Sequence, residues 1–316
     1  MDHSLYVAAI SEIVCKNLHL KEIEIDPLLA RTIGIGHDLG HAPFGHAGEQ
    51  VLNQLAGQIG GFKHERHGLR IVDKLEKPKN EIPVIGLNLT LAVRDGIVNH
   101  CGEDKATRIS PITEPNLAED SLPSTLEGCV VRIADKVAYL GRDIEDAIVA
   151  GLVNEENIPA RIKTHIGTRN GEIVDFFVGD LIKASGETEI GLSDEAGALM
   201  KQLSDFNYDR IYRHPKVEVY KERVNDVLEV LFTRLTRILS TNEDKIDQYM
   251  NNGLNVYALL GRFLDERRQL YFKEEAGSYD SDEKLFMRIA VDFMSTLTDR
   301  LVFESCSEFF LPEPIV

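Results

Sequence analysis

The sequence predicts an all-α protein. Apolar residues recur every three or four positions in most segments of the 316-residue chain, as they do along one face of an amphipathic helix. Segments that alternate apolar and polar residues, which would predict half-buried strands, are scarce. Hydrophobic residues make up 43% of the chain, which is enough for a substantial core. These observations favour helices packed on helices.

The helices expected in the first half begin and end at recognisable residues. Residues 5–18 repeat apolar side chains with a period near 3.6. Asp26-Pro27 begins a second helix, because the missing N–H of proline is no loss in a first turn. A third helix runs from Glu49 to Leu55 and stops at Gly57. Three more helices are expected at residues 67–75, 87–100 and 125–153.

Helices also dominate the expected second half. Asn170-Gly171 has the composition of a tight turn, and the apolar residues from Ile173 to Ile182 predict a helix after it. The segments 75–83 and 101–123 are polar and contain proline, which predicts loops. Four amphipathic helices are expected at residues 195–208, 216–240, 255–272 and 281–301.

Charge and cysteine content restrict the partners and the compartment. The formal net charge is −17, and an acidic surface repels a phosphate backbone, so we expect no nucleic-acid partner. Four cysteines occur without a CxxC pair, which is typical of a reduced compartment and argues against a thiolate zinc site. The first residues lack the features of a signal peptide, and no apolar run reaches the roughly 18 residues that span a bilayer. We therefore expect a cytoplasmic protein with no membrane contact.

The segment from His37 to Glu49, HDLGHAPFGHAGE, concentrates metal-binding residue types. It holds three histidines and two acids among three glycines. Imidazole and carboxylate groups bind divalent metals in intracellular proteins. The glycines permit a local turn through which adjacent His37 and Asp38 can reach one ion. A lone His-Asp pair is weak evidence, but the whole run strongly indicates a site.

This run resembles the signature of the HD superfamily of metal-dependent phosphohydrolases, and most closely its deoxynucleoside triphosphate triphosphohydrolase (dGTPase-like) branch. The superfamily pattern is an early histidine, a His-Asp pair and a late aspartate, each on a separate helix. The matching residues are His3 in DHSLYVA, His37-Asp38, and Asp135 in VRIADKVAY. The resemblance implies an HD-type helical core at residues 1–153, with a helical C-terminal region at 154–316 packed on it.

The matched residues would form one metal site. Two imidazoles and two carboxylates leave coordination positions open for water and substrate, as catalysis requires. The resemblance implies one divalent ion, and Mn, Mg, Fe, Co, Ni and Zn all tolerate such ligands. A structural alternative for Asp135 is an ion pair with Arg132 or Lys136. His3 lies at the N-terminal end, where chains often fray.

Further residues of the run match catalytic positions of the family. His46 and Glu49 are three residues apart, so on a helix they share a face, and such a pair suits general acid–base chemistry. In relatives the matching pair serves the attacking water or the leaving oxygen, and the residue matching His41 faces the phosphates. His64, in GFKHE, matches a histidine near the scissile phosphate. Glu49 could also be a charge in the first turn of the following helix, stabilised by the dipole, and both roles can hold together.

The helix that carries Asp135 also carries substrate-binding candidates. Residues matching Lys136, Tyr139 and Asp143 in relatives contact phosphate, pack against the sugar and accept a hydrogen bond from its 3′-hydroxyl. A tyrosine against C2′ would reject ribose. The alternative is a solvated charged face with Tyr139 at the edge of the core. Residues 207–215 also resemble a family segment, in which an arginine could reach a phosphate.

We therefore expect a homo-oligomer that hydrolyses deoxynucleoside triphosphates to deoxynucleoside and inorganic triphosphate. Two alternatives are a phosphohydrolase for another nucleotide or phosphoester, and a non-catalytic nucleotide-binding regulatory module. The first stays open because relatives carry a few dozen nucleotide-holding residues before the first histidine. This chain begins two residues before His3, either as a short form or because upstream residues are missing.

Overall fold

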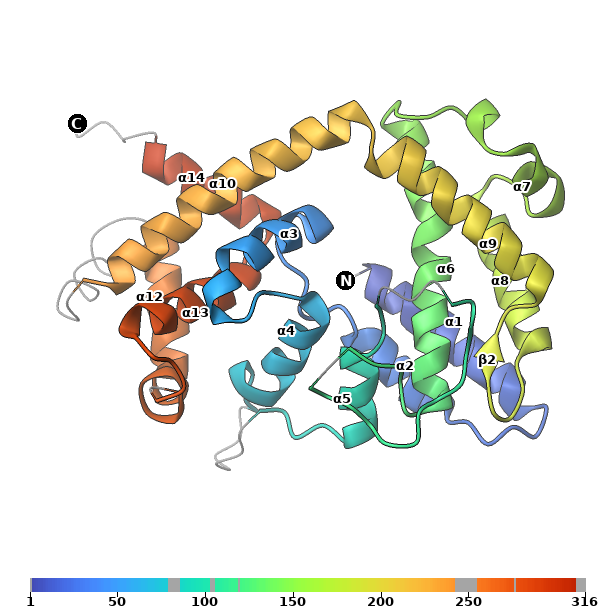
Figure 1. Cartoon of the computed structure of the whole chain (residues 1–316), viewed down its shortest axis with the longest axis horizontal. Coiled ribbons are helices and arrows are strands. Elements are labelled where there is room, and N and C mark those ends of the chain that lie inside the picture. Colours follow the sequence, from blue (N-terminus) through green and yellow to red (C-terminus); the bar gives the residue numbers. More distant parts are fainter. Residues whose placement is uncertain are drawn as a thin grey trace. The chain divides into compact units, whose positions relative to one another are not determined.

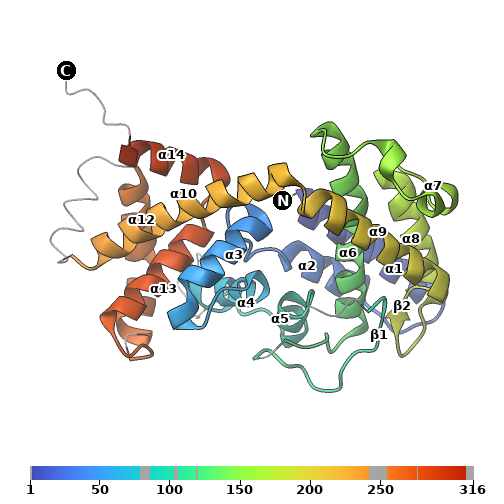
Figure 2. The ribbon, with the colours of Figure 1, turned by 45° about the horizontal axis from the view of Figure 1, so that its top comes forward.

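The all-α prediction is confirmed by a computed structural model of the chain (Figure 1). Within the described residues, the only strands are the antiparallel pair β1 (Arg108–Ile109) and β2 (Ile190–Gly191), which lie side by side in Figure 2. Among the same residues, no helix is both long and apolar enough to cross a membrane. The structure describes residues 2–78, 86–102, 106–118, 120–241, 255–275 and 277–310.

The chain divides into two compact units. Unit 1 comprises Met1–Leu39 and Asn88–Glu218, and unit 2 comprises Gly40–Leu87 and Val219–Val316. This division differs from the predicted ranges 1–153 and 154–316. The reason is that helices after residue 153 pack on the helix of Asp135, whereas the segment from Gly40 shares a core with the C-terminal helices. The predicted catalytic core at 1–153 stays a prediction.

Unit 1 is assembled around the long helix α6 (Leu126–Val149). Thr125 caps it by accepting a hydrogen bond from the backbone N–H of Gly128. Figure 1 shows α1 and α8 beside α6. The α-helices that pack on α6 include α1 (Asp2–His19), α2 (Pro27–Gly36), α5 (Leu91–Val98), α8 (Asn170–Ala184) and α9 (Asp194–Asn207). The shorter elements of this unit are η3 (Glu155–Asn157), α7 (Ala160–His165) and η4 (Tyr208–Tyr212).

Two glycines let α2 approach its neighbours closely. A Cβ atom on Gly34 would lie 2.7 Å from the Cα atom of Ala8 on α1. A Cβ atom on Gly96 of α5 would lie 2.5 Å from the Cδ1 atom of Ile33 on α2. A larger residue at either place would force the helices apart. The glycines therefore hold α1, α2 and α5 close enough for their histidines to meet.

Unit 2 joins a short early segment to the C-terminal helices. Buried side chains from both, such as Leu52, Phe62, Leu228 and Phe293, form one core. The helices are α3 (Gly45–Leu55), α4 (His64–Arg70), α12 (Asn255–Gln269), α13 (Asp282–Ser295) and α14 (Asp299–Phe310), with α10 (Pro215–Leu239) entering this unit at Val219. The shorter elements are η1 (Gly57–Ile59), η2 (Ile71–Leu75) and η5 (Leu270–Glu274).

Several helix bounds differ from the predicted ones. The helix predicted at 87–100 begins at Leu91, because Thr90 caps it and accepts from the N–H of Val93. The helix predicted at 281–301 is two helices, because Thr298 accepts from the N–H of Leu301 and begins α14. The short helix α7 was not predicted. Parts of the predicted loops, at residues 79–83, 103–105 and 119, lie outside the described residues.

Candidate metal centre and catalytic residues

The four predicted metal ligands lie together in unit 1. His3 is on α1, His37-Asp38 directly follows α2, and Asp135 is on α6. The Nε2 atom of His3 lies 2.9 Å from Oδ1 of Asp135 and 3.7 Å from Oδ2 of Asp38. The Nε2 atom of His37 lies 3.5 Å from Oδ2 of Asp38 and 3.6 Å from Oδ1 of Asp135. Ligand atoms this close can surround one divalent ion, whose bonds to nitrogen and oxygen are about 2.0–2.2 Å long.

His37 is oriented as a metal-binding histidine should be. Its side chain is fully buried, and its Nδ1–H donates to the carbonyl oxygen of Gly34 at 2.7 Å. The opposite nitrogen, Nε2, is buried and makes no hydrogen bond to any described residue. A histidine ligand usually donates one ring N–H to a carbonyl or carboxylate and binds metal with the other nitrogen. The residues present therefore fit a divalent metal.

The electrostatics of the group centre on Asp135. Burial alone would raise the pKa of Asp135, but its hydrogen bond with His3 and the neighbouring imidazole of His37 lower it well below its usual range. Burial alone would likewise lower the pKa of His37, but Asp135 and Asp38 raise it. Both basic residues suggested as alternative partners of Asp135 contact main-chain carbonyl oxygens. Arg132 donates to the carbonyls of Asn99 and Cys101, each at 2.7 Å, and Lys136 Nζ lies 3.3 Å from the carbonyl of Ala106.

Tyr139 and Asp143 continue along α6 from Asp135. Burial, together with Asp135 and Asp143, raises the pKa of Tyr139, so its hydroxyl stays protonated. Asp143 accepts a hydrogen bond from the hydroxyl of Tyr212 in η4. Tyr212 was not predicted, although the 207–215 segment that contains it was noted. Lys136, Tyr139 and Asp143 stay predicted substrate contacts.

The four predicted catalytic and phosphate-facing residues lie together in unit 2. Glu49 on α3 accepts two hydrogen bonds at Oε1 from His64, at 2.8 Å from its main-chain N and 3.0 Å from Nδ1. The Oε2 atom of Glu49 lies 3.3 Å from Nδ1 of His46. The His41 ring stacks on the His64 ring, with centroids 4.6 Å apart and planes 3° from parallel. Glu49 therefore links two imidazoles that differ in exposure, because the His64 side chain is 7% exposed and that of His46 is 80% exposed.

Glu49 is held ionised by these histidines. Burial alone would raise the pKa of Glu49, but hydrogen bonds from His46 and His64 lower it well below its usual range. An ionised carboxylate that accepts from Nδ1 leaves Nε2 of each ring as the atom suited to proton transfer. The structure places Glu49 beyond the first turn of α3, which contains no acidic residue, so the predicted first-turn role is not observed.

His100 was missed by the sequence predictions. It follows α5, is 1% exposed, and lies with its ring centroid 4.9 Å from that of His37. One ligand atom of His100 lies within 4.8 Å of ligand atoms of His37 and Asp38. No local motif marks this residue, because its proximity to the site arises only from the packing of α5 on α2.

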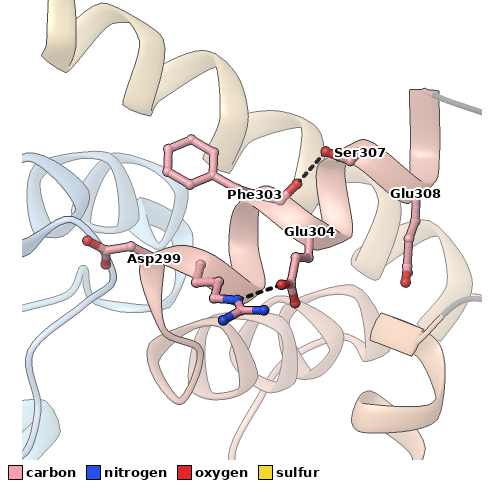
Figure 3. A pocket seen from close by; sticks show the side chains of 6 residues that line it. Asp299, Phe303, Glu304, Ser307 and Glu308 are labelled. Carbon is pink, nitrogen blue, oxygen red and sulfur yellow. Dashed lines mark hydrogen bonds and ion pairs between the residues drawn. The ribbon is translucent and has the colours of Figure 1, made fainter.

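A surface hollow on α14 holds none of the predicted site residues. It is lined by Asp299, Arg300, Phe303, Glu304, Ser307 and Glu308, five of which Figure 3 labels. Its polar groups already have partners, in other segments for two of them: Asp299 accepts from the N–H of Phe44, and Glu308 from that of Val256. Arg300 donates to Glu304 at 2.7 Å, and the Ser307 hydroxyl donates to the carbonyl of Phe303 at 2.9 Å. The histidine groups therefore remain the stronger candidates for chemistry.

Comparisons with known proteins point to one family. The HD domain matches residues 1–140, a range that includes the four predicted metal ligands. The chain is similar to the deoxyguanosinetriphosphate triphosphohydrolase-like protein of Caldanaerobacter subterraneus subsp. tengcongensis, with 32% identity over 99% of this chain and 75% of the relative. The like-named protein of Desulfatibacillum aliphaticivorans is 32% identical over 100% of this chain and 79% of the relative. That of Clostridium perfringens strain 13 is 36% identical over 72% of this chain and 61% of the relative.

Proposed function

Because the chain belongs to the dGTPase-like branch of the HD-superfamily hydrolases, we propose that it hydrolyses deoxynucleoside triphosphates to deoxynucleoside and inorganic triphosphate. Membership of the family supports the coarser activity, metal-dependent phosphohydrolysis. The observation that carries the proposal is the meeting of two imidazoles and two carboxylates around the orphaned Nε2 of His37.

We propose His3, His37, Asp38 and Asp135 as the metal ligands. Their mixed nitrogen and oxygen donors suit Mn, Mg, Fe, Co, Ni or Zn. When bound, a divalent ion would polarise a phosphoryl oxygen and make a water molecule more acidic. The protein contributes the orientation: the carbonyl of Gly34 holds the His37 ring, and three helices bring the donors together.

We propose His46, Glu49 and His64 as the catalytic residues that move protons. In the proposed reaction, the oxygen of water bonds to the α-phosphorus, the bond from phosphorus to the sugar 5′-oxygen breaks, and a proton reaches that oxygen. Glu49 would hold the Nδ1–H of both rings, so that Nε2 can accept a proton from water or supply one to the leaving oxygen. His41, stacked on His64, would contact the phosphates.

We propose Lys136, Tyr139 and Asp143 as substrate contacts, with Lys136 on phosphate. Tyr139 would pack against the sugar and reject a 2′-hydroxyl, and Asp143 would accept a hydrogen bond from the 3′-hydroxyl. The hydrogen bond from Tyr212 supports the role of Asp143, because it fixes one carboxylate oxygen. We also propose a homo-oligomer in the cytoplasm, and sedimentation of the purified protein tests the assembly.

The test is to supply purified protein with each divalent ion and each ribo- and deoxyribonucleotide, and to identify products by chromatography. Free triphosphate and deoxynucleoside are the expected products, with deoxyribonucleotides preferred. Tyr139→Ala should erode that preference by about tenfold or more, as a lost steric and polar discrimination does. Orthophosphate or pyrophosphate as the only inorganic product would favour a different phosphohydrolase. Metal and nucleotide binding without turnover would favour a regulatory module.

A further inference from the structure

We propose that His100 is a third imidazole ligand of the metal centre, beyond the set formed by His3, His37, Asp38 and Asp135. The proposal rests on the proposed function, because it presumes that this set binds a metal. Nothing in the HD pattern of the sequence points to His100. The inference comes from its position in unit 1, where it shares a potential ligand group with His37 and Asp38.

His100 repeats the local arrangement of His37. Each lies just beyond the end of a helix, and each Nδ1–H donates at 2.7 Å to the carbonyl three residues earlier, Gly34 for His37 and Ile97 for His100. This bond fixes the ring and makes Nε2 the nitrogen with a lone pair for a metal. The two rings meet edge to face with centroids 4.9 Å apart, and both are almost completely buried. His37 and His100 are therefore held in the same way, and both lie near the carboxylate of Asp38.

The backbone on both sides of His100 is clamped by the helix that carries Asp135. Arg132, 2% exposed on α6, donates from NH1 to the carbonyls of Asn99 and Cys101, the two neighbours of His100. The amide of Asn99 donates in turn to Asp95 at 2.9 Å, and Asp95 accepts from the N–H of Ser124 at 2.7 Å. Because the buried guanidinium of Arg132 donates to main-chain carbonyls, it holds the backbone of residues 99–101 in place. Because Arg132 and Asp135 are on the same helix, this clamp sets the position of His100 relative to Asp135.

A third imidazole changes which metal the centre prefers. A site with two carboxylates and two imidazoles accepts Mg²⁺ readily, whereas each further nitrogen donor favours Fe²⁺, Co²⁺, Ni²⁺ or Zn²⁺ over Mg²⁺. His100 would thus raise the affinity for these borderline ions with little effect on Mg²⁺. A purely structural histidine, retained for its bond to Ile97, would leave metal preference unchanged.

The test uses full-length protein and Co²⁺ as the probe. His100→Asn keeps a side-chain N–H near the position of Nδ1, so that the bond to Ile97 is retained, but removes the Nε2 ligand. His100→Ala removes both groups, and His165→Ala removes an exposed histidine on α7 as the matched control. Metal affinity is measured by calorimetry with Co²⁺ and with Mg²⁺, and the coordination of Co²⁺ by its visible absorption. Circular dichroism establishes that each variant is folded.

We expect His100→Asn to bind Co²⁺ at least 10- to 100-fold more weakly than wild type, with a changed Co²⁺ spectrum and a smaller loss for Mg²⁺. His165→Ala should match wild type. Wild-type affinity and spectrum in folded His100→Asn would overturn the proposal while leaving the four-ligand centre intact. Weaker binding with an unchanged spectrum would also overturn it, because a lost ligand must alter coordination. Failure of wild type to bind any divalent ion would instead reject the proposed function itself.

Discussion

Asp135 in unit 1 and Asp292 in unit 2 have opposite kinds of partner. Asp292 is fully buried, and Nε of Arg70 donates to its two oxygens at 2.9 and 3.0 Å, while the Tyr271 hydroxyl donates at 2.9 Å. Asp135 instead faces the imidazoles of His3 and His37. A guanidinium is a permanent cation, whereas an imidazole is neutral when it binds a metal. The charge of Asp292 is therefore neutralised by the fold, and that of Asp135 remains for a cation.

The surroundings of Asp292 are saturated with fixed charges. Glu275 accepts from NH1 and NH2 of Arg70 at 2.8 and 2.9 Å and from Lys74 at 2.7 Å. Burial alone would raise the pKa of Glu275, but Arg70 and Lys74 lower it to about 2. These pairs connect α4 and η2 to α13 and to Glu275, the residue that follows η5. In this protein, the carboxylates paired with arginine or lysine stabilise the fold, whereas the carboxylate paired with imidazoles is available to bind a metal.

The largest expected effect is the loss of hydrolysis in Asp135→Ala. Without this carboxylate the protein should hold no stoichiometric metal, and the rate should fall by about 10³-fold or more, because a bound metal contributes several kcal/mol to catalysis. Helical circular dichroism should persist, because His3 and His37, which face Asp135, can stay neutral without this carboxylate. Elemental analysis and turnover measurements test both points. A variant that retained one metal ion per chain would contradict the assignment.

Unit 2 also contains a carboxylate with imidazole partners, Glu49, so we expect its substitution to affect activity rather than stability. Glu49→Gln should lower turnover by about 10²- to 10⁴-fold, the usual contribution of general acid–base groups, and leave metal content unchanged. His46→Ala should behave similarly. Gln50→Ala, at the exposed neighbouring position on α3, is the control. Near-normal rates for Glu49→Gln would remove it from the catalytic residues and leave His64 as the principal candidate.

Asp292→Ala should have the reverse profile. Removing Asp292 leaves the largely buried Arg70 with Glu275 as its remaining carboxylate partner, which Lys74 shares, so two cations then face one anion. Breaking a buried ion pair in this way costs about 3–5 kcal/mol of unfolding free energy. Urea unfolding and hydrogen exchange of α13 measure the loss, and the metal content of the folded fraction should match wild type. Arg300→Ala breaks an ion pair in which the arginine side chain is 87% exposed, so it should hardly change stability. If Asp292→Ala lost metal but kept its stability, the assignment of Asp292 as a structural residue would be wrong.

Local sequence patterns carried most of the fold and the central part of the site. Periodicity predicted the long helices. The run from His37 to Glu49 contains members of both groups, His37-Asp38 in unit 1 and three residues of the group in unit 2. Their roles stay predictions. The position of His100 beside His37 could not be predicted, since it depends on a glycine contact between α2 and α5 and on the hydrogen bonds from Arg132. The network of Arg70, Glu275 and Asp292 could not be predicted either, because Arg70 is more than 200 residues from both carboxylates along the chain. Unit 2 is likewise built from two stretches of chain that no local pattern connects.

The smallest expected effect is a pH dependence of stability that arises from His67, the histidine on the structural side of the comparison. Its Nε2 lies 2.6 Å from the Ser295 hydroxyl, and its Nδ1 lies 3.8 Å from Asp292. Burial lowers the pKa of His67 to about 4, with Arg70 and Arg288 acting in the same direction and Asp292 opposing them. An unfolded histidine has a pKa of about 6.5, so between pH 6.5 and 4 the unfolded chain binds a proton that the folded protein does not.

Folding stability should therefore fall as the pH is lowered from about 6.5 to 4, with His67 contributing at most about 1.4 kcal/mol per pH unit. His67→Gln should flatten the dependence in that window, whatever its stability at neutral pH. Val72→Ala, at a fully buried position in the following η2 segment, is the matched control because it lowers stability without removing a titrating group. Urea unfolding at half-unit pH steps measures the three slopes. An equal slope of unfolding free energy against pH in wild type and His67→Gln would show that the acid sensitivity arises from another group. A flatter slope in His67→Gln together with a wild-type slope in Val72→Ala would assign the acid sensitivity to His67.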